Sequence, residues 1–75
     1  MKVEVHLFAD LSRYLPAGVA AVELPDGVSV ADLAQHLAIP DDLPRLTLVN
    51  GQDAPPDRRL APGDVVDILP PLAGG

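Results

Sequence analysis

The sequence predicts an α+β fold, in which one main helix packs on a mixed β-sheet of four to five strands. Three observations lead to this prediction. Several segments alternate apolar and polar residues, which is the pattern of half-buried strands. One segment, residues 30–37, has apolar residues at helical spacing instead. The chain has 75 residues, the length of a single small domain.

Residues 2–8 and 19–24 are predicted to be the first two strands. In each of them, every second residue is apolar and falls on one face: Val3, Val5 and Leu7 in the first, and Ala20, Val22 and Leu24 in the second. The stretch between them, residues 9–18, loses the alternation and has room for one irregular helical turn. This connection allows the two strands to pair as a hairpin.

The helix is predicted to begin after Ser29. Serine is a favoured N-cap residue, and Asp32 stands three residues later, as in a capping box. The apolar residues that follow share one face: Val30, Leu33, Ala34 and Leu37. Pro40 cannot continue a helix, so the helix must end before it.

Two further strands and a short one are predicted after the helix. Residues 45–49 alternate and end at the turn pair Asn50-Gly51. Residues 52–59 contain two adjacent prolines and leave room for at most a short edge strand. Residues 65–69 form the last strand, with Val66 and Ile68 facing inward. The order is therefore strand, strand, helix, strand, short strand, strand.

Composition excludes several classes of function. The chain has 11 acidic and 5 basic residues, a formal charge of −6 and no cysteine. An acidic protein without a basic stripe is a poor binder of nucleic acid or of an anionic membrane surface. No apolar run approaches the ~20 residues that span a bilayer. We therefore expect a cytoplasmic domain that works with macromolecular partners.

No conventional active site is evident. His6 and His36 lie on different elements without metal-ligand spacing, so we expect two solvated histidines and no metal site. Ser29 is accounted for as a helix cap. Arg58-Arg59 could bind an anion, although a solvated pair in a loop is the commoner reading.

The last six residues, Pro70 to Gly75, are the unusual feature. Pro70 and Pro71 favour an extended backbone, and at ~3.1 Å per residue such a tail reaches roughly 18 Å from the last strand. Gly74 and Gly75 lack Cβ atoms, so an enzyme's channel can close around bare backbone. A linker or tag remnant is the alternative source of two terminal glycines. The pattern predicts a tail whose backbone is restricted at the two prolines and whose flexible end, at the two glycines, is the reactive part.

Four segments resemble the MoaD/ThiS family of ubiquitin-like sulfur carrier proteins: Phe8-Ala9-Asp10-Leu11, Val49-Asn50-Gly51, Leu60-x-x-Gly63-Asp64-x-Val66 and Pro70-Pro71-x-Ala73-Gly74-Gly75. The resemblance covers nearly the whole chain. Its specific part is the Gly-Asp-x-Val strand start followed by a terminal Gly-Gly, and the ending is most similar to the MoaD branch. It implies a ubiquitin-like β-grasp domain over residues 1–69 and a flexible C-terminal tail over residues 70–75.

The resemblance also implies a chemistry. In this family a ubiquitin-activating-type adenylyltransferase (MoeB/ThiF-like) uses ATP to adenylate the terminal carboxylate, here that of Gly75. Sulfur then replaces AMP, and the resulting thiocarboxylate donates sulfur to a precursor held by a synthase such as MoaE or a thiazole synthase. The chain would be a carrier or a synthase small subunit, with no bound cofactor. Because it lacks cysteine, it cannot carry sulfur as a side-chain persulfide.

A partner surface is expected beside the tail. Phe8 falls opposite the apolar face of its strand, and Leu69 falls opposite Val66 and Ile68. In a β-grasp the first and last strands are parallel neighbours, so both residues should lie at the same end. We expect Thr47 and Val49 to extend this face. Partner binding is assigned to Phe8, Leu69, Pro70, Pro71, Leu72 and Ala73. The alternative is that the loop of residues 9–18 covers Phe8.

Two classes of function remain after this reading. The first is a sulfur carrier, for molybdopterin above all and otherwise for thiamine, cysteine or tRNA thiolation. The second is a protein modifier that is joined to lysines through Gly75. A carrier yields a thiocarboxylate, whereas a modifier yields adducts of higher mass.

Overall fold

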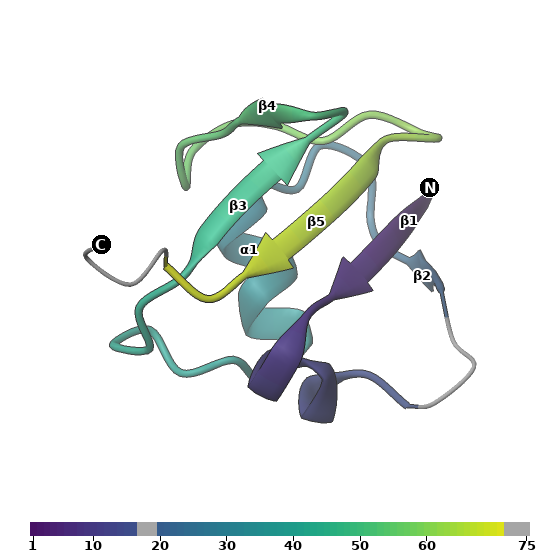
Figure 1. Cartoon of the computed structure of the whole chain (residues 1–75). Coiled ribbons are helices and arrows are strands. Elements are labelled where there is room, and N and C mark those ends of the chain that lie inside the picture. The colour runs from purple at the N-terminus through teal and green to yellow at the C-terminus, as the bar shows by residue number, and fades with distance from the viewer. Residues whose placement is uncertain (17–19, 72–75) are drawn as a thin grey trace.

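The computed structural model describes residues 1–16 and 20–71. Its elements follow the predicted order (Figure 1). They are β1 (Lys2–Leu7), the 3₁₀ helix η1 (Ala9–Tyr14), β2 (Ala21–Glu23), α1 (Val30–His36), β3 (Leu46–Val49), β4 (Gln52–Asp53) and β5 (Val65–Leu69). The α+β prediction is confirmed, and the possible turn after β1 is η1. None of the helices in the described residues is long and apolar enough to cross a membrane.

The five strands form one mixed sheet in the order β2-β1-β5-β3-β4. β1 and β5 are parallel neighbours in the centre, and the other pairs are antiparallel. α1 covers one face of the sheet, and the other face is open in Figure 1, where α1 lies behind the strands. This arrangement confirms the predicted β-grasp.

The core lies between α1 and the covered face of the sheet. Ser29 accepts a hydrogen bond from the Asp32 N–H, and the Asp32 carboxylate accepts one from the Ser29 N–H, so the predicted capping box is present. The predicted apolar face of the helix is buried, and Leu33 at its centre is 0% exposed. Val3, Val5, Val66 and Ile68 meet it from the two central strands. The helix and the parallel strand pair therefore hold the domain together.

Two predicted strands differ from the observed ones. β2 is shorter than the predicted segment of residues 19–24: Val22 and Leu24 are buried, Ala20 is exposed, and Val19 lies outside the described residues. The prediction that Thr47 and Val49 face outward is wrong, because both are buried in the covered face. Their β5 partners, Ile68 and Val66, are core residues, so the pairing register turns Thr47 and Val49 toward α1.

A hydrogen-bonded corner joins the β3–β4 turn to the start of β5. The carboxylate of Asp64 accepts hydrogen bonds from the Ala61 N–H at 2.8 Å, from Asn50 Nδ2 at 3.0 Å and from Arg58 Nη1 at 3.1 Å. These bonds, led by the one from Ala61, hold the pKa of Asp64 below its ordinary value of 3.8. Asn50 Oδ1 in turn accepts a bond from the Val65 N–H. The corner fixes where β5 begins.

Asp64→Asn is expected to lower the free energy of unfolding by about 2 kcal/mol at neutral pH, because an amide cannot accept all three bonds as an anion does. The folded pKa of Asp64 is depressed, so its contribution is present above its unfolded pKa and is lost as pH falls through the lower folded value. The measurement is urea unfolding of the wild type and of Asp64→Asn at a series of pH values, from neutral pH to below the folded pKa of Asp64. The difference between them should shrink toward low pH, and a constant difference would contradict the role given to the charge.

Candidate functional site

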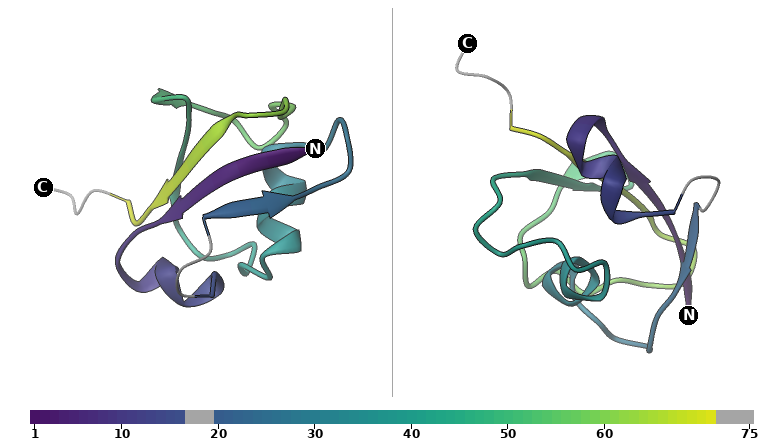
Figure 2. Two further views of the ribbon diagram at one scale, coloured as in Figure 1. Left: turned by 90° about the vertical axis from the view of Figure 1, so that its right-hand side faces the viewer. Right: turned by 90° about the horizontal axis from the view of Figure 1, so that it is seen from below.

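The tail leaves the domain at the end of β5. Pro70 and Pro71, which follow Leu69, are exposed. Pro70 borders a crevice of about 250 Å³ together with Tyr14 from η1 and Leu43 from the loop before β3. Figure 2 shows the C-terminal end of β5 beside the end of β1, its parallel neighbour. The predicted site residues Leu72, Ala73, Gly74 and Gly75 lie outside the described residues.

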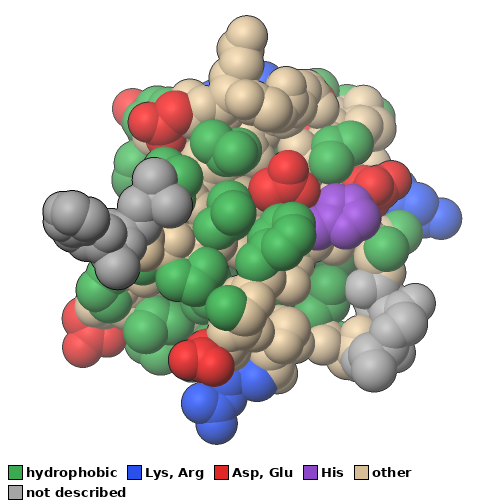
Figure 3. Space-filling model, in the orientation of Figure 1, with side chains coloured by type: hydrophobic (Ala, Val, Ile, Leu, Met, Phe, Trp, Pro, Cys, Tyr) green, Lys and Arg blue, Asp and Glu red, His purple; other side chains and the backbone are tan. Residues whose placement is uncertain are grey.

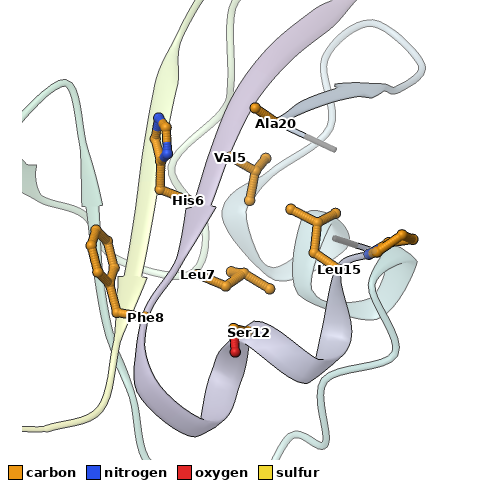
Figure 4. Close-up of a pocket in the computed structure, with 8 residues that line it drawn as sticks. Val5, His6, Leu7, Phe8, Ser12, Leu15 and Ala20 are labelled. Atoms are coloured by element: carbon orange, nitrogen blue, oxygen red, sulfur yellow. The ribbon is translucent and has the colours of Figure 1, made fainter. Parts of the chain in front are cut away.

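Phe8 stands beside the point where the tail leaves. Its N–H donates to the Ile68 carbonyl at 3.1 Å, which continues the β1–β5 ladder and sets Phe8 next to Leu69. Phe8 is 44% exposed, as is expected for a residue opposite the buried face of β1. Figure 4 shows Phe8 and His6 on one side of β1, with Val5 and Leu7 on the other. The loop after β1 thus leaves Phe8 open, and its role in partner binding stays a prediction.

The open face of the sheet carries an apolar surface that continues from Phe8. Leu46 and Leu48 on β3 pair with Leu69 and Asp67 on β5, and cross-strand partners share a face. Leu46, Leu48, Val65 and Leu69 are all half-buried there. Figure 3 shows hydrophobic side chains gathered on this face. We call the surface formed by Phe8, Leu46, Leu48, Val65 and Leu69 the outer patch.

Sequence reasoning missed three members of this patch, Leu46, Leu48 and Val65. Leu46 and Leu48 flank Thr47 in the run Leu-Thr-Leu-Val, where both faces of the strand carry apolar residues. The alternation therefore does not decide which face of the strand points to the core. Only the pairing with β5 decides it. The one hint in the sequence was Thr47, whose side chain is small enough to pack between the sheet and α1.

A second hollow lies between β1 and η1 (Figure 4). It has a volume of about 400 Å³ and is lined mostly by apolar side chains, among them Val5, Leu7 and Leu15. Ser12, which also lines it, donates its hydroxyl hydrogen to the Ala9 carbonyl at 2.8 Å. His6 also lines this hollow, but its imidazole contacts Glu4 and the Ser12 hydroxyl donates to Ala9, so the described residues show no hydrogen-bonded Ser–His pair there.

The other candidate residues have structural partners. Arg59 Nη1 donates to the Gly27 carbonyl at 2.7 Å, and Arg58 binds Asp64, so neither arginine is held ready for an anion. His6 lies against Glu4 on β1, and His36 is exposed on α1. Within residues 1–16 and 20–71, no cluster of His, Cys, Asp and Glu could hold a metal ion. What the described residues offer is an apolar surface next to the end of β5, where the C-terminal tail begins.

Comparison with known proteins agrees with this geometry. The sequence model of the ThiS family matches residues 5–75. A putative molybdopterin converting factor subunit 1 from Pyrococcus furiosus is 31% identical, with 95% of this chain and 98% of that chain covered and a TM-score of 0.75. Small archaeal modifier protein 1 of H. volcanii is 26% identical, with 95% and 98% covered and a TM-score of 0.74.

A more distant structure has the same fold. It is the complex of subunits 1 and 2 of molybdopterin-converting factor from Helicobacter pylori, which matches with 23% identity, complete coverage of both chains (100% and 100%) and a TM-score of 0.60. No curated protein matches the sequence significantly. The chain has the ubiquitin-like fold that small sulfur carriers and protein modifiers share, and it belongs to the ThiS family.

Proposed function

We propose that this protein is a sulfur carrier whose reactive group is the carboxylate of Gly75. Residues 1–69 act as the recognition domain, and residues 70–75 act as the arm that reaches into a partner enzyme. The observation that carries this proposal is the family match, which runs through the Gly-Gly ending to residue 75. The outer patch beside the start of the arm supports it, because it offers a docking surface at the right end of the domain.

The chemistry needs an activating enzyme. A carboxylate oxygen of Gly75 attacks the α-phosphorus of ATP, and pyrophosphate leaves. The acyl-adenylate then carries a good leaving group, which a free carboxylate lacks. Sulfide attacks the acyl carbon and AMP leaves. Where a persulfide attacks instead, a second thiol must cleave the S–S bond. Either route leaves a thiocarboxylate, and this chain supplies no catalytic side chain to the reaction.

We assign the carrier first to molybdopterin synthesis. The support is the 31% identity to the P. furiosus protein, which is described as a putative molybdopterin converting factor subunit 1. The H. pylori subunit 1 forms a complex with a subunit 2. By analogy, a large synthase subunit of the MoaE kind would be the second partner, after an adenylyltransferase of the MoeB/ThiF kind. The chain would then be the small subunit of the synthase and not a catalyst by itself.

A protein modifier is the second candidate function. The H. volcanii relative at 26% identity is described as a small archaeal modifier protein. In this case a lysine amine, instead of sulfide, attacks the activated Gly75 and forms an isopeptide bond. The outer patch and the arm would serve the same activating step.

The experiment that separates the two functions expresses the N-terminally tagged protein in its own host and recovers it under denaturing conditions. A carrier appears as a free protein that reacts with a thiocarboxylate-specific probe. A modifier appears as adducts of higher mass that survive thiol treatment. A free protein with an unmodified carboxylate, under conditions in which the pathway is active, contradicts both proposals.

Phe8→Ser is expected to weaken binding to the activating enzyme by about tenfold or more, since exposed aromatic side chains at the centre of contact surfaces commonly dominate affinity. The unfolding free energy should change by less than about 1 kcal/mol, because Phe8 is not a core residue. Calorimetric titration together with thermal unfolding tests both statements. Ala20→Ser, at an exposed position on the other side of β1, is the control. Unchanged affinity of Phe8→Ser would remove Phe8 from the docking surface.

A further inference from the structure

Asp67 lies in the middle of the outer patch. Along β5 it stands between Val65 and Leu69, which point to the same face because side chains alternate along a strand. Across the sheet it pairs with Leu48 on β3 and with His6 on β1. Asp67 is half-buried at this position. A carboxylate is thus set among apolar side chains on the surface that is proposed to dock a partner.

None of the residues that the structure describes supplies a cation to this carboxylate. Among residues 1–16 and 20–71, the ion pairs are those of the Met1 amino group with Asp26 and of Arg58 with Asp64, and His6 contacts Glu4. The imidazole of His6, the nearest basic group across the strand, is directed to Glu4 at 2.5 Å. Arg45 donates to backbone carbonyls in the loop before β3. Asp67 is therefore left for solvent or for a partner.

The charge of the open face favours a cationic partner. The strand registers set four acidic residues, one lysine and one histidine on this face: Glu4, Glu23, Asp53, Asp67, Lys2 and His6. Lys2 pairs with Glu23 at the far end of β1. Such a face repels an anionic membrane or nucleic acid and attracts a basic protein surface.

Burial of the outer patch by a partner restricts which side chain the partner can place against Asp67. When a partner covers the leucines around Asp67, it also removes water from the carboxylate. A buried carboxylate without a cation is strongly destabilising, whereas a well-placed guanidinium offsets this cost with two parallel hydrogen bonds. Arginine suits the site better than lysine, since its guanidinium is less strongly hydrated. A guanidinium also stacks on aromatic rings, and Phe8 is the aromatic member of the patch.

We propose that the outer patch docks a protein surface that presents an arginine ringed by apolar side chains, with its guanidinium paired to Asp67. The proposal deepens the proposed function, because it names the chemistry of the surface by which an activating enzyme or a synthase subunit would hold the carrier. In this proposal Asp67 contributes to the affinity for the partner, and the arm carries the reactive group.

The test measures binding of the full chain to the purified activating enzyme from the same genome, and separately to the large synthase subunit. Three variants are compared with the wild type: Asp67→Asn, Asp67→Leu and Asp57→Asn. Asp57 is exposed in the turn between β4 and β5, so Asp57→Asn makes the same change in net charge away from the patch. Thermal unfolding of each variant checks that the fold is retained.

Asp67→Asn and Asp67→Leu should each weaken binding by about tenfold or more, as is usual when one member of a buried charge pair is removed. Asp57→Asn should stay within about twofold. Tighter binding by Asp67→Leu would overturn the proposal, because it would mean that the partner's surface at this point is apolar and merely tolerates the carboxylate. Equal losses for Asp57→Asn and Asp67→Asn would also overturn it, since they would indicate long-range attraction only.

Adenylation separates this inference from the proposed function. At saturating enzyme, Asp67→Asn should be adenylated at the wild-type rate while its KM rises, because Gly75 is untouched. Wild-type protein that binds the enzyme but is never adenylated would contradict the proposed function and leave the docking result standing. Wild-type protein that binds neither partner would overturn both.

Discussion

Deletion of Gly75, or Gly74→Ala, is expected to abolish adenylation and to leave the thermal unfolding midpoint almost unchanged. Removal of one residue draws the carboxylate back by about 3.3 Å. A Cβ atom at position 74 fills space that the partner's channel reserves for bare backbone. Misplacement of a reacting group by even ~1 Å can lower a rate on the order of a hundredfold. Both changes lie beyond β5, where chain ends normally add little to stability.

The experiment measures binding and ATP–pyrophosphate exchange on the same variants. Binding should persist, because Phe8, Leu69 and Asp67 are unchanged. Asp57→Asn, an exposed substitution in the turn between β4 and β5, serves as a control away from the arm and the outer patch. Normal exchange by the Gly75 deletion would show that this glycine is not the acyl site. A marked fall in the unfolding midpoint would show that residues 74 and 75 are packed parts of the fold.

Leu33→Ala is expected to lower the free energy of unfolding by about 2–5 kcal/mol, the usual range for a fully buried leucine. Leu33 is 0% exposed and lies at the centre of α1, the helix that covers the sheet. A domain of this size has only about 4–11 kcal/mol in total, so the substitution removes a large share of its stability. Urea unfolding followed by circular dichroism is the measurement.

Gln35→Ala is the matched control, since Gln35 is exposed on the same helix. It should change the unfolding free energy by less than about 0.5 kcal/mol. If Leu33→Ala has an equally small effect, the helix does not pack on the sheet in the way described.

The elements that could be predicted from the sequence are those with local causes. Ser29 and Asp32 cap the helix through each other's backbone, so the two residues mark its start without reference to the rest of the chain. The turn at Asn50-Gly51 is equally local, because both residues adopt positive φ, 53° and 82°, as a type I′ hairpin turn requires. Val65–Leu69 was predicted with its observed bounds for the same reason: turns and alternation agree there.

Which side chains of β3 face the core could not be predicted, because this is decided by the pairing of β3 with β5 and not by the local sequence. Leu46, Thr47, Leu48 and Val49 would suit either face, and the register with Ile68 and Val66 decides the outcome. The same register creates the outer patch and sets Asp67 within it. Consequently the sequence indicated Phe8 and Leu69, which lie next to each other on β1 and β5, but not the leucines of β3 or the carboxylate of Asp67.

Two of the motif residues that suggested the family, Asn50 and Asp64, have a structural role. Asn50 and Asp64 bind each other at the start of β5, which is the opposite end of that strand from the arm. They identify the fold and do not take part in the proposed chemistry. The assignment of function therefore rests on residues 70–75 and on the outer patch.

The most direct test of the sulfur-carrier proposal is the intact mass of the purified protein after incubation with its activating enzyme, ATP and sulfide. We predict a mass increase equal to the replacement of one oxygen by sulfur. Fragmentation should locate it in the C-terminal fragment that ends at Gly75, and the increase should be absent when ATP is omitted. An unchanged mass, in a reaction where the same enzyme preparation forms the acyl-adenylate, would contradict the account.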